Sequence, residues 1–408
     1  MYRQSVQPEP RPTGKPSDLW PDQAEAKWPR GCLIENVAIH PSQPWLAAAC
    51  TATEEDTGAI LVFDTQSGRL RAVTPTEGFV GWSDPRLLRW HPDGRRLATN
   101  VDTNGIALLD RGAWVGRAFP DDTRDSGVGY VWVGERLFAD TGAFFEITPG
   151  DDQFEFDELA APRFQAIEWN ASAGVVVGTV GTGVAAYDPV AEREVYRETL
   201  DAYGHSGTLS WSPDGRWFVR RKFATPPAAD ELLFICGDTG KVHGVRQPSS
   251  PRIDELAWGP RGALAVSSYV HNLATGGRSG RKVDIFRAGE LALSIDLASR
   301  SIQGSHSIAE ASGIAWSPRG DGLALLLDQQ EIRIIDAHSG VSLSTFAAPA
   351  PPIPDGLPDY YGKRHRPGFG FPGDLVWVDD QRLVRIAPHF VTVWSMDGEK
   401  IAEFVVEG

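Results

Sequence analysis

The sequence has 408 residues, of which 41% are hydrophobic and 23% are charged, a composition typical of a soluble globular protein. No window approaches 18 apolar residues, which argues against a membrane-spanning helix, and the composition also argues against wholesale disorder. The net charge of -15 disfavours a general nucleic-acid binder, because such a protein gains affinity by neutralising phosphates.

Residues 1–32 are expected to form a separate N-terminal arm. Prolines are frequent there, apolar residues are few, and no periodicity is visible, which together predict a flexible segment. The alternative is an extended arm whose Trp20 and Trp28 dock on the rest of the protein or on a partner. The arm lacks the apolar stretch of a secretory signal, so we expect a cytoplasmic protein without a membrane partner.

The three cysteines point to the same compartment. Cys32, Cys50 and Cys236 are odd in number and widely spaced, and no two of them form a CxxC motif. This pattern fits a reducing compartment better than a disulfide framework.

A repeated motif runs through the remainder of the chain. A strand ends in Trp, a turn containing Pro and Gly follows, and an apolar strand comes next, as in LRWHPDGR (88–95) and LSWSPDGR (209–216). Proline pre-sets φ for the turn, glycine supplies a positive φ, and the Trp side chain would fill the space between neighbouring sheets. A second half of the unit, seen in ILVFDTQSG (60–68) and IRIIDAHSG (332–340), adds two more strands.

Eight such units, each with four strands, follow one another along the chain. Their anchors are separated by 37 to 61 residues and are Ile39, Trp90, Trp132, Trp169, Trp211, Trp258, Trp316 and Trp377. A repeat of this length with four strands is typical of a β-propeller. We therefore predict an all-β fold in which residues 33–408 form one propeller of eight four-stranded blades. Seven blades are the alternative, if the unit at Trp132, which has the poorest turn, is not a blade.

The repeat resembles the WD40-type β-propeller family, including its degenerate bacterial relatives. Gly204-His205 precedes a strand as the Gly-His dipeptide of that family does, and Phe63-Asp64 and Ile335-Asp336 stand where the family has Trp-Asp. No unit has an intact Gly-His together with Trp-Asp. The resemblance covers about residues 33–406 and implies the propeller fold.

Propeller geometry divides the connections between two faces of the disc. In a four-stranded blade with strands a to d, the a–b and c–d turns lie on one face and the b–c and d–a connections on the other. The a–b and c–d turns are short here, so almost all insertions decorate one face, which we call the loop-rich face. Long loops are often functional, so we expect this to be the working face. The long segments are 51–58, 74–85, 120–127, 223–231, 269–282, 298–312 and 347–373.

Candidate partner-binding residues gather on the same face. The longest segment is rich in aromatic and basic residues, the types that dominate protein interfaces. Basic residues also end one strand of unit five and lie in the b–c loop of unit six. They would suit an acidic partner, a phosphorylated segment or a nucleic acid, the last of which the net charge disfavours. The candidates are Arg220, Arg221, Lys222, Arg278, Arg281, Lys282, Tyr360, Tyr361, Arg364, His365, Arg366, Phe369 and Phe371.

Catalytic signatures are absent from the sequence. There is no G-x-S-x-G, H-E-x-x-H or Walker A motif, and the histidines show no metal-ligand spacing, so we expect no cofactor and no metal. His40 and His91 belong to turn motifs, where a structural hydrogen-bonding role is expected. The sequence thus predicts a non-catalytic interaction scaffold that binds proteins or peptides within a multi-protein complex. The alternative is a propeller enzyme, such as a metal-dependent hydrolase or lactonase, with its site in the central channel.

Overall fold

Every regular element that the structure describes is a β-strand. The structure is a computed structural model, and it describes these residues: 20, 22–23, 26–52, 57–77, 88–101, 105–118, 129–140, 143–149, 154–164, 166–181, 183–200, 209–212, 215–224, 228–260, 262–271, 278–297, 313–327, 330–349, 351, 375–387 and 389–405.

The first four blades are antiparallel sheets of four consecutive strands. Blade 1 contains β1 (Cys32–Ile39), β2 (Trp45–Ala52), β3 (Thr57–Asp64) and β4 (Arg69–Glu77). Blade 2 contains β5 (Leu88–Trp90), β6 (Arg96–Val101), β7 (Gly105–Asp110) and β8 (Ala113–Ala118). Blade 3 contains β9 (Gly129–Val133), β10 (Arg136–Asp140), β11 (Phe144–Pro149) and β12 (Phe154–Glu158). Blade 4 contains β13 (Ala166–Asn170), β14 (Val175–Val180), β15 (Gly183–Asp188) and β16 (Arg193–Glu198).

The last four blades repeat this order. Blade 5 contains β17 (Leu209–Trp211), β18 (Trp217–Lys222), β19 (Glu231–Cys236) and β20 (Val242–Arg246). Blade 6 contains β21 (Arg252–Trp258), β22 (Ala263–His271), β23 (Arg278–Arg287) and β24 (Glu290–Asp296). Blade 7 contains β25 (Ile314–Trp316), β26 (Gly322–Leu327), β27 (Glu331–Asp336) and β28 (Ser342–Ala347). Blade 8 contains β29 (Leu375–Asp379), β30 (Arg382–Ala387), β31 (Phe390–Ser395) and β32 (Lys400–Val405).

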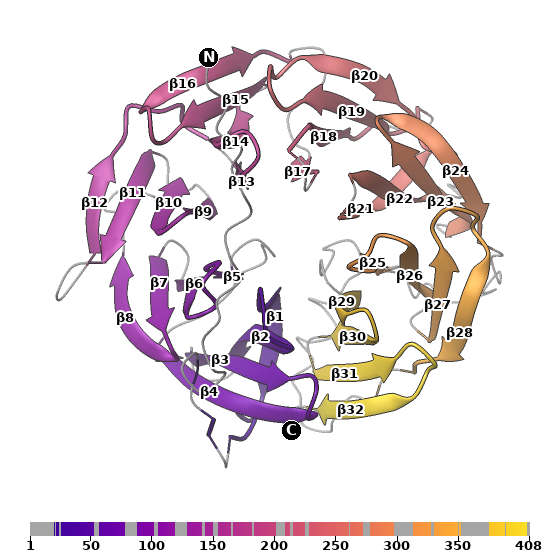
Figure 1. Ribbon diagram of the computed structural model, residues 1–408, viewed down its shortest axis with the longest axis horizontal. Helices are drawn as coiled ribbons and strands as arrows, with labels where there is room; N and C mark the ends of the chain where they lie inside the picture. Colours follow the sequence, from indigo (N-terminus) through magenta and orange to yellow (C-terminus); the bar gives the residue numbers. More distant parts are fainter. Residues whose placement is uncertain are drawn as a thin grey trace.

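The blades form a closed ring, with the first strand of each blade nearest the axis and the fourth at the circumference (Figure 1). The predicted all-β propeller with eight blades is therefore confirmed, and all eight anchor residues lie in first strands. The alternative of seven blades is wrong, because the unit at Trp132 forms a complete sheet despite its short turn at Gly134 and Glu135. The Gly-His pair at 204–205 lies outside the described residues.

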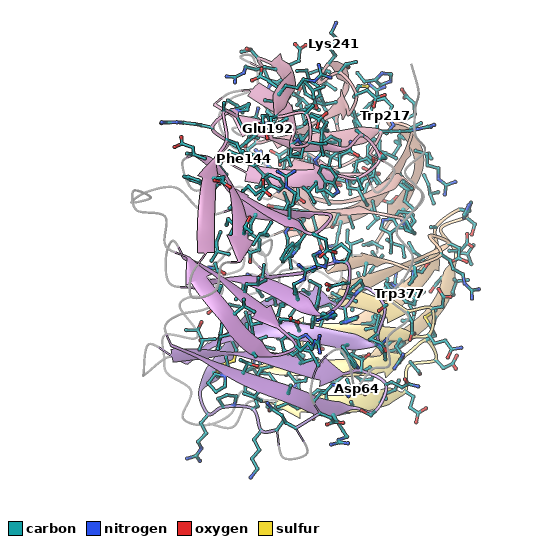
Figure 2. The ribbon with its side chains drawn as sticks, turned by 60° about the vertical axis from the view of Figure 1, so that its left-hand side comes forward. Asp64, Phe144, Glu192, Trp217, Lys241 and Trp377 are labelled. Atoms are coloured by element: carbon teal, nitrogen blue, oxygen red, sulfur yellow. A yellow bond between two sulfur atoms is a disulfide. The ribbon has the colours of Figure 1, made fainter. Side chains whose placement is uncertain are left out.

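The core lies between the blades, where apolar side chains of neighbouring sheets fill the intervening layer (Figure 2). All eight seams contain such a cluster, which buries one face of each sheet against the next. The acid at the end of a third strand stabilises the turn that follows it. Asp64 Oδ1, for example, accepts hydrogen bonds from the backbone N–H groups of Gln66 and Ser67. Side-chain packing therefore joins the blades, and local hydrogen bonds shape the turns.

The anchor tryptophans also join blades by hydrogen bonds. The indole N–H of Trp90 donates to the carbonyl of Ala38 at 3.1 Å, and the indole N–H of Trp316 donates to that of Ala257 at 2.8 Å. Trp132 and Trp377 make the same contact with the blade before them. In each of these four blades the acceptor immediately precedes the previous anchor, whereas the buried indole N–H groups of Trp211 and Trp258 have no acceptor among the described residues.

The a–b turns carry a second link between blades. His40 Nε2 lies 2.9 Å from the carbonyl of Gly94 in the next blade, while its Nδ1 accepts two N–H groups of its own turn. His91 and Asn170 hold the same position and bond to Gly134 and Gly215. Gly94 has φ 72° and lies against the His40 ring, so any larger residue there would be strained and would clash. The expected structural role of His40 and His91 is confirmed.

One expectation about the cysteines is wrong. Cys32 in β1 and Cys50 in β2 form a disulfide, with their Cα atoms 5.5 Å apart, and Cys236 is free. No sequence pattern indicates the pair, because the two cysteines are 18 residues apart and meet only through the register of adjacent antiparallel strands, in which Cys50 lies opposite Ile34.

Candidate functional site

The loop-rich face carries the candidate site. Strand order places the b–c and d–a connections at one end of every blade, as the sequence predicted, and the a–b and c–d turns at the other. Of the predicted partner-binding residues, Tyr360, Tyr361, Arg364, His365, Arg366, Phe369 and Phe371 lie outside the described residues. Arg278 begins β23, and its side chain is likewise not described. The other five lie on blades 5 and 6.

Asp230 is a buried acid that binds basic residues from both of these blades. Its side chain is 1% exposed and accepts hydrogen bonds from Arg221 Nη2 at 3.0 Å and Arg252 Nη1 at 2.9 Å. It also accepts the backbone N–H groups of Ala224 and Ile253, each at 3.0 Å. Arg221 lies near the end of β18, strand b of blade 5, and Arg252 begins β21, strand a of blade 6, so one buried carboxylate ties the two blades together at this face.

Burial disfavours the charged form of the Asp230 carboxyl, but the hydrogen-bond donors around it have the larger effect on its pKa. The two backbone N–H groups and the Arg221 guanidinium hold the pKa of the Asp230 carboxyl below its usual value. Burial lowers the pKa of the Arg221 guanidinium, and its bond to Asp230 counteracts that effect. Burial also lowers the pKa of Arg220, which is only 2% exposed. Asp230 and Arg221 thus form an ion pair that is largely shielded from water.

The other predicted basic residues face carboxylates. Lys222 Nζ lies 3.0 Å from Glu231, and Arg281 Nη2 lies 3.4 Å from Asp254. Lys282 Nζ lies 3.2 Å from Asp296, a residue whose side chain is largely exposed. The described part of the predicted patch is therefore a surface of paired charges, in which acids offset the positive charge of the bases.

One aromatic residue of this surface was missed in the sequence. Phe223 follows the Arg-Arg-Lys run directly and is 55% exposed, and the guanidinium carbon of Arg221 lies 4.0 Å from the centre of its ring. Val270, near the end of β22, is also exposed. The sequence does contain a signal for Phe223: an aromatic residue that directly follows the end of a strand rich in arginine.

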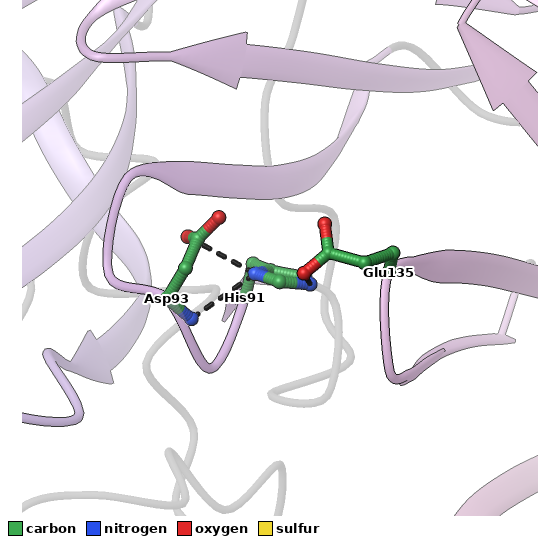
Figure 3. Close-up of side chains that lie close together, drawn as sticks. All are labelled: His91, Asp93 and Glu135. Carbon is green, nitrogen blue, oxygen red and sulfur yellow. Dashed lines mark hydrogen bonds and ion pairs between the residues drawn. The ribbon is translucent and has the colours of Figure 1, made fainter. Parts of the chain in front are cut away.

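A second cluster lies on the opposite face, between blades 2 and 3. The ligand atoms of His91, Asp93 and Glu135 all lie within 4.8 Å of one another (Figure 3), and this is the one such group of possible metal ligands within the described ranges. Arg96 fills it, since its Nη2 donates to Asp93 and to Glu135. Both ring nitrogens of His91 are also engaged, Nδ1 by the Asp93 N–H and Nε2 by the Gly134 carbonyl. The donor set therefore fits a guanidinium better than a metal ion.

Two acids of the described first strands are held in ion pairs. Glu168 of β13 pairs with Arg89 of β5 at 2.9 Å, which links blade 4 to blade 2, and Asp254 pairs with Arg281. The alternative of an enzyme centred in the channel requires converging acids, histidines or amides that are available to a metal. These two acids are already in ion pairs.

In the described parts of the chain, no helix is long and apolar enough to cross a membrane.

Comparison with known structures agrees with this architecture. The Dos1 propeller is 12% identical with a TM-score of 0.59, and the match covers 94% of this chain and 95% of that one. Hydrazine synthase of Kuenenia stuttgartiensis is 12% identical with a TM-score of 0.51, over 92% and 98% of the two chains.

At such low identities this likeness shows the fold alone. No protein-family model and no curated protein matches the sequence. Fold and site together define an eight-bladed β-propeller whose loop-rich face carries a surface of paired charges with an exposed aromatic residue on blades 5 and 6.

Proposed function

We propose that the chain is a WD40-type propeller that acts as a non-catalytic scaffold in the cytoplasm. It recruits one or more proteins or peptides to a multi-protein complex through its loop-rich face. The repeated Trp and turn motifs and the likeness to solved propellers support the type of fold. The surface on blades 5 and 6 supports the mode of action.

The exposed side chain of Phe223 is the observation that carries this proposal. Aromatic residues and arginines contribute most of the binding energy in protein interfaces, above all where the side chain is held rigidly before binding. Phe223 packs on the Arg221 guanidinium, and Arg221 is fixed by the buried Asp230. The aromatic ring is therefore presented on a preorganised support rather than on a free loop.

The charges around Phe223 suggest the character of the partner. Lys222 and Lys282 are about one third exposed and are paired with Glu231 and Asp296. Carboxylates of an acidic partner could replace these acids while an apolar side chain covers the ring of Phe223. Such an exchange of ion pairs favours specificity and association rate more than affinity.

A pull-down with matched variants tests the proposal. The tagged protein is recovered from its own cells, and co-purifying proteins are quantified by mass spectrometry. F223A is expected to lose the stoichiometric partner. L343A is the control, because Leu343 is 59% exposed but lies on β28 at the circumference of blade 7. Equal recovery with both variants would contradict the proposed surface, and the absence of any stoichiometric partner would favour the channel enzyme.

A further inference from the structure

Part of the N-terminal arm lies in a groove at the outer edge of blade 1. Residues 20, 22 and 23 belong to no strand, yet they contact β4 and the seam between blades 1 and 2. Residues 1–19 of the predicted flexible arm lie outside the described residues. The contacts of the three described residues have the form of a bound peptide.

Trp20 is the anchor of this segment. It is 0% exposed and packs with Trp45 of blade 1 and with Trp90 and Leu97 of blade 2. Its ring centre is 5.2 Å from that of Trp90, edge to face, and its indole N–H donates to the Arg95 carbonyl at 2.9 Å. A buried aromatic ring with its N–H satisfied is a typical peptide anchor.

Gln23 forms hydrogen bonds with the free edge of β4. Its backbone N–H donates to the Arg71 carbonyl at 2.9 Å. Its side-chain amide both accepts from the Val73 N–H at 2.9 Å and donates to the Val73 carbonyl at 3.2 Å. The amide therefore takes the place of a peptide group in an added strand, and main-chain pairing of this kind is how sheet edges bind extended segments.

Two arginines of β4 recognise the residues between these anchors. Arg71 Nη2 donates to the Trp20 carbonyl at 2.9 Å, and its Nη1 lies 3.6 Å from the Asp22 carboxylate. Arg69 lies 3.8 Å from the same carboxylate. The groove thus recognises Trp, an acid two residues later and Gln three residues later.

The strand pairing beside the segment does not depend on the arm. β4 is paired with β3 along its whole length, from Thr57 opposite Glu77 to Asp64 opposite Arg69. The seam between blades 1 and 2 has its own indole bond and histidine link. Trp20 is the single buried residue among the three, since Asp22 and Gln23 are exposed. Exchange of the segment therefore requires the release of one buried side chain, together with the edge contacts of Asp22 and Gln23.

We infer that the outer edge of β4 and the adjoining seam form a peptide-binding groove, which Trp20, Asp22 and Gln23 occupy in cis. An extended segment of another protein takes their place when it carries the same pattern of Trp, acid and Gln. The cis segment competes at a high effective concentration, on the order of millimolar for a short tether. The full chain thus keeps the groove closed to weak ligands.

A binding titration on the full chain tests this inference. A labelled peptide of residues 17–26 (SDLWPDQAEA) is titrated with wild type and with W20A, and fluorescence anisotropy is measured. W20A empties the anchor pocket and is expected to bind the peptide saturably, at least about tenfold more tightly than wild type. A peptide with Ala in place of its Trp is expected to bind W20A about tenfold more weakly.

Controls keep the result decisive. Adding R71A to W20A should weaken peptide binding about tenfold, since Arg71 contacts both the Trp carbonyl and the acid. If W20A does not unfold cooperatively, D22A/Q23A replaces it, because this variant keeps the buried ring and removes the side-chain contacts with the edge of β4. A folded variant that does not bind the peptide, or binds it no better than wild type, overturns the inference.

Discussion

Replacement of Asp230 by alanine should destabilise the protein strongly. The change removes a carboxylate that accepts four hydrogen bonds and leaves Arg221 and Arg252, 18% and 13% exposed, side by side without their shared acid. Loss of one partner of a buried ion pair costs about 3 to 5 kcal/mol. Both guanidinium groups keep some contact with water, which places the expected loss in unfolding free energy near the lower end, about 3 kcal/mol.

Urea unfolding followed by tryptophan fluorescence measures this loss. The midpoint should fall while the slope m stays unchanged, since the amount of surface exposed on unfolding is nearly the same. E231A is the matched control, because Glu231 is the next residue and pairs with Lys222 near the surface, a contact worth about 1 kcal/mol or less. A loss below about 1 kcal/mol for D230A, or an equal loss for both variants, would refute the argument.

Three further predictions concern the links between and within blades. Burial lowers the pKa of His40 to about 4, so its share of the stability, roughly 3 kcal/mol, is complete above pH 6.5 and is lost as the pH falls towards 4. H40N, which copies Asn170 of blade 4, should flatten stability over that pH range in urea titrations, and an unchanged pH profile would contradict this. C50A should lower unfolding free energy by about 3 kcal/mol in non-reducing buffer, whereas C236A should not, and equal losses would count against the disulfide. W316F should cost about 1 to 2 kcal/mol and lower the thermal midpoint, and an unchanged midpoint would disprove the contribution of its indole bond.

The sequence predicts the ring well because each blade repeats the same local signals. Trp90 and Trp316 stand before turns whose glycines adopt positive φ, and both signals lie within a few residues of one another. The unit at Trp132 looked weakest because its turn contains only Gly134 and Glu135. A two-residue turn still connects two paired strands, so the number of blades does not depend on that turn.

The candidate site was less predictable, because its contacts join residues from different blades. The Arg220-Arg221-Lys222 run is visible in the sequence, but the acid that fixes Arg221 comes nine positions later, in a connection without periodicity. Arg252, the second donor to that acid, belongs to the next blade. A cluster of charged residues in a sequence therefore shows where charged side chains are concentrated, and only the fold shows which of them are already paired.

The seam between blades 8 and 1 shows how the ring closes without sharing a strand. Each blade consists of four consecutive strands, so the first and last blades meet there without a shared strand. Ile39 takes the anchor position in blade 1 and has no side-chain N–H with which to bond to blade 8. The seam instead packs Phe63 against Phe404, with their ring centres 4.7 Å apart.

The disulfide lies within the same cluster. Cys32 and Cys50 pack with Val384 and Val393 of blade 8, and both cysteines are almost fully buried. Their bond joins the two inner strands of blade 1, so these strands meet blade 8 as one rigid surface. Among the described residues, no strand pairing and no indole bond crosses this seam, so close side-chain packing on a rigid pair of strands is what holds it. Loss of the Cys32–Cys50 bond should therefore loosen this seam.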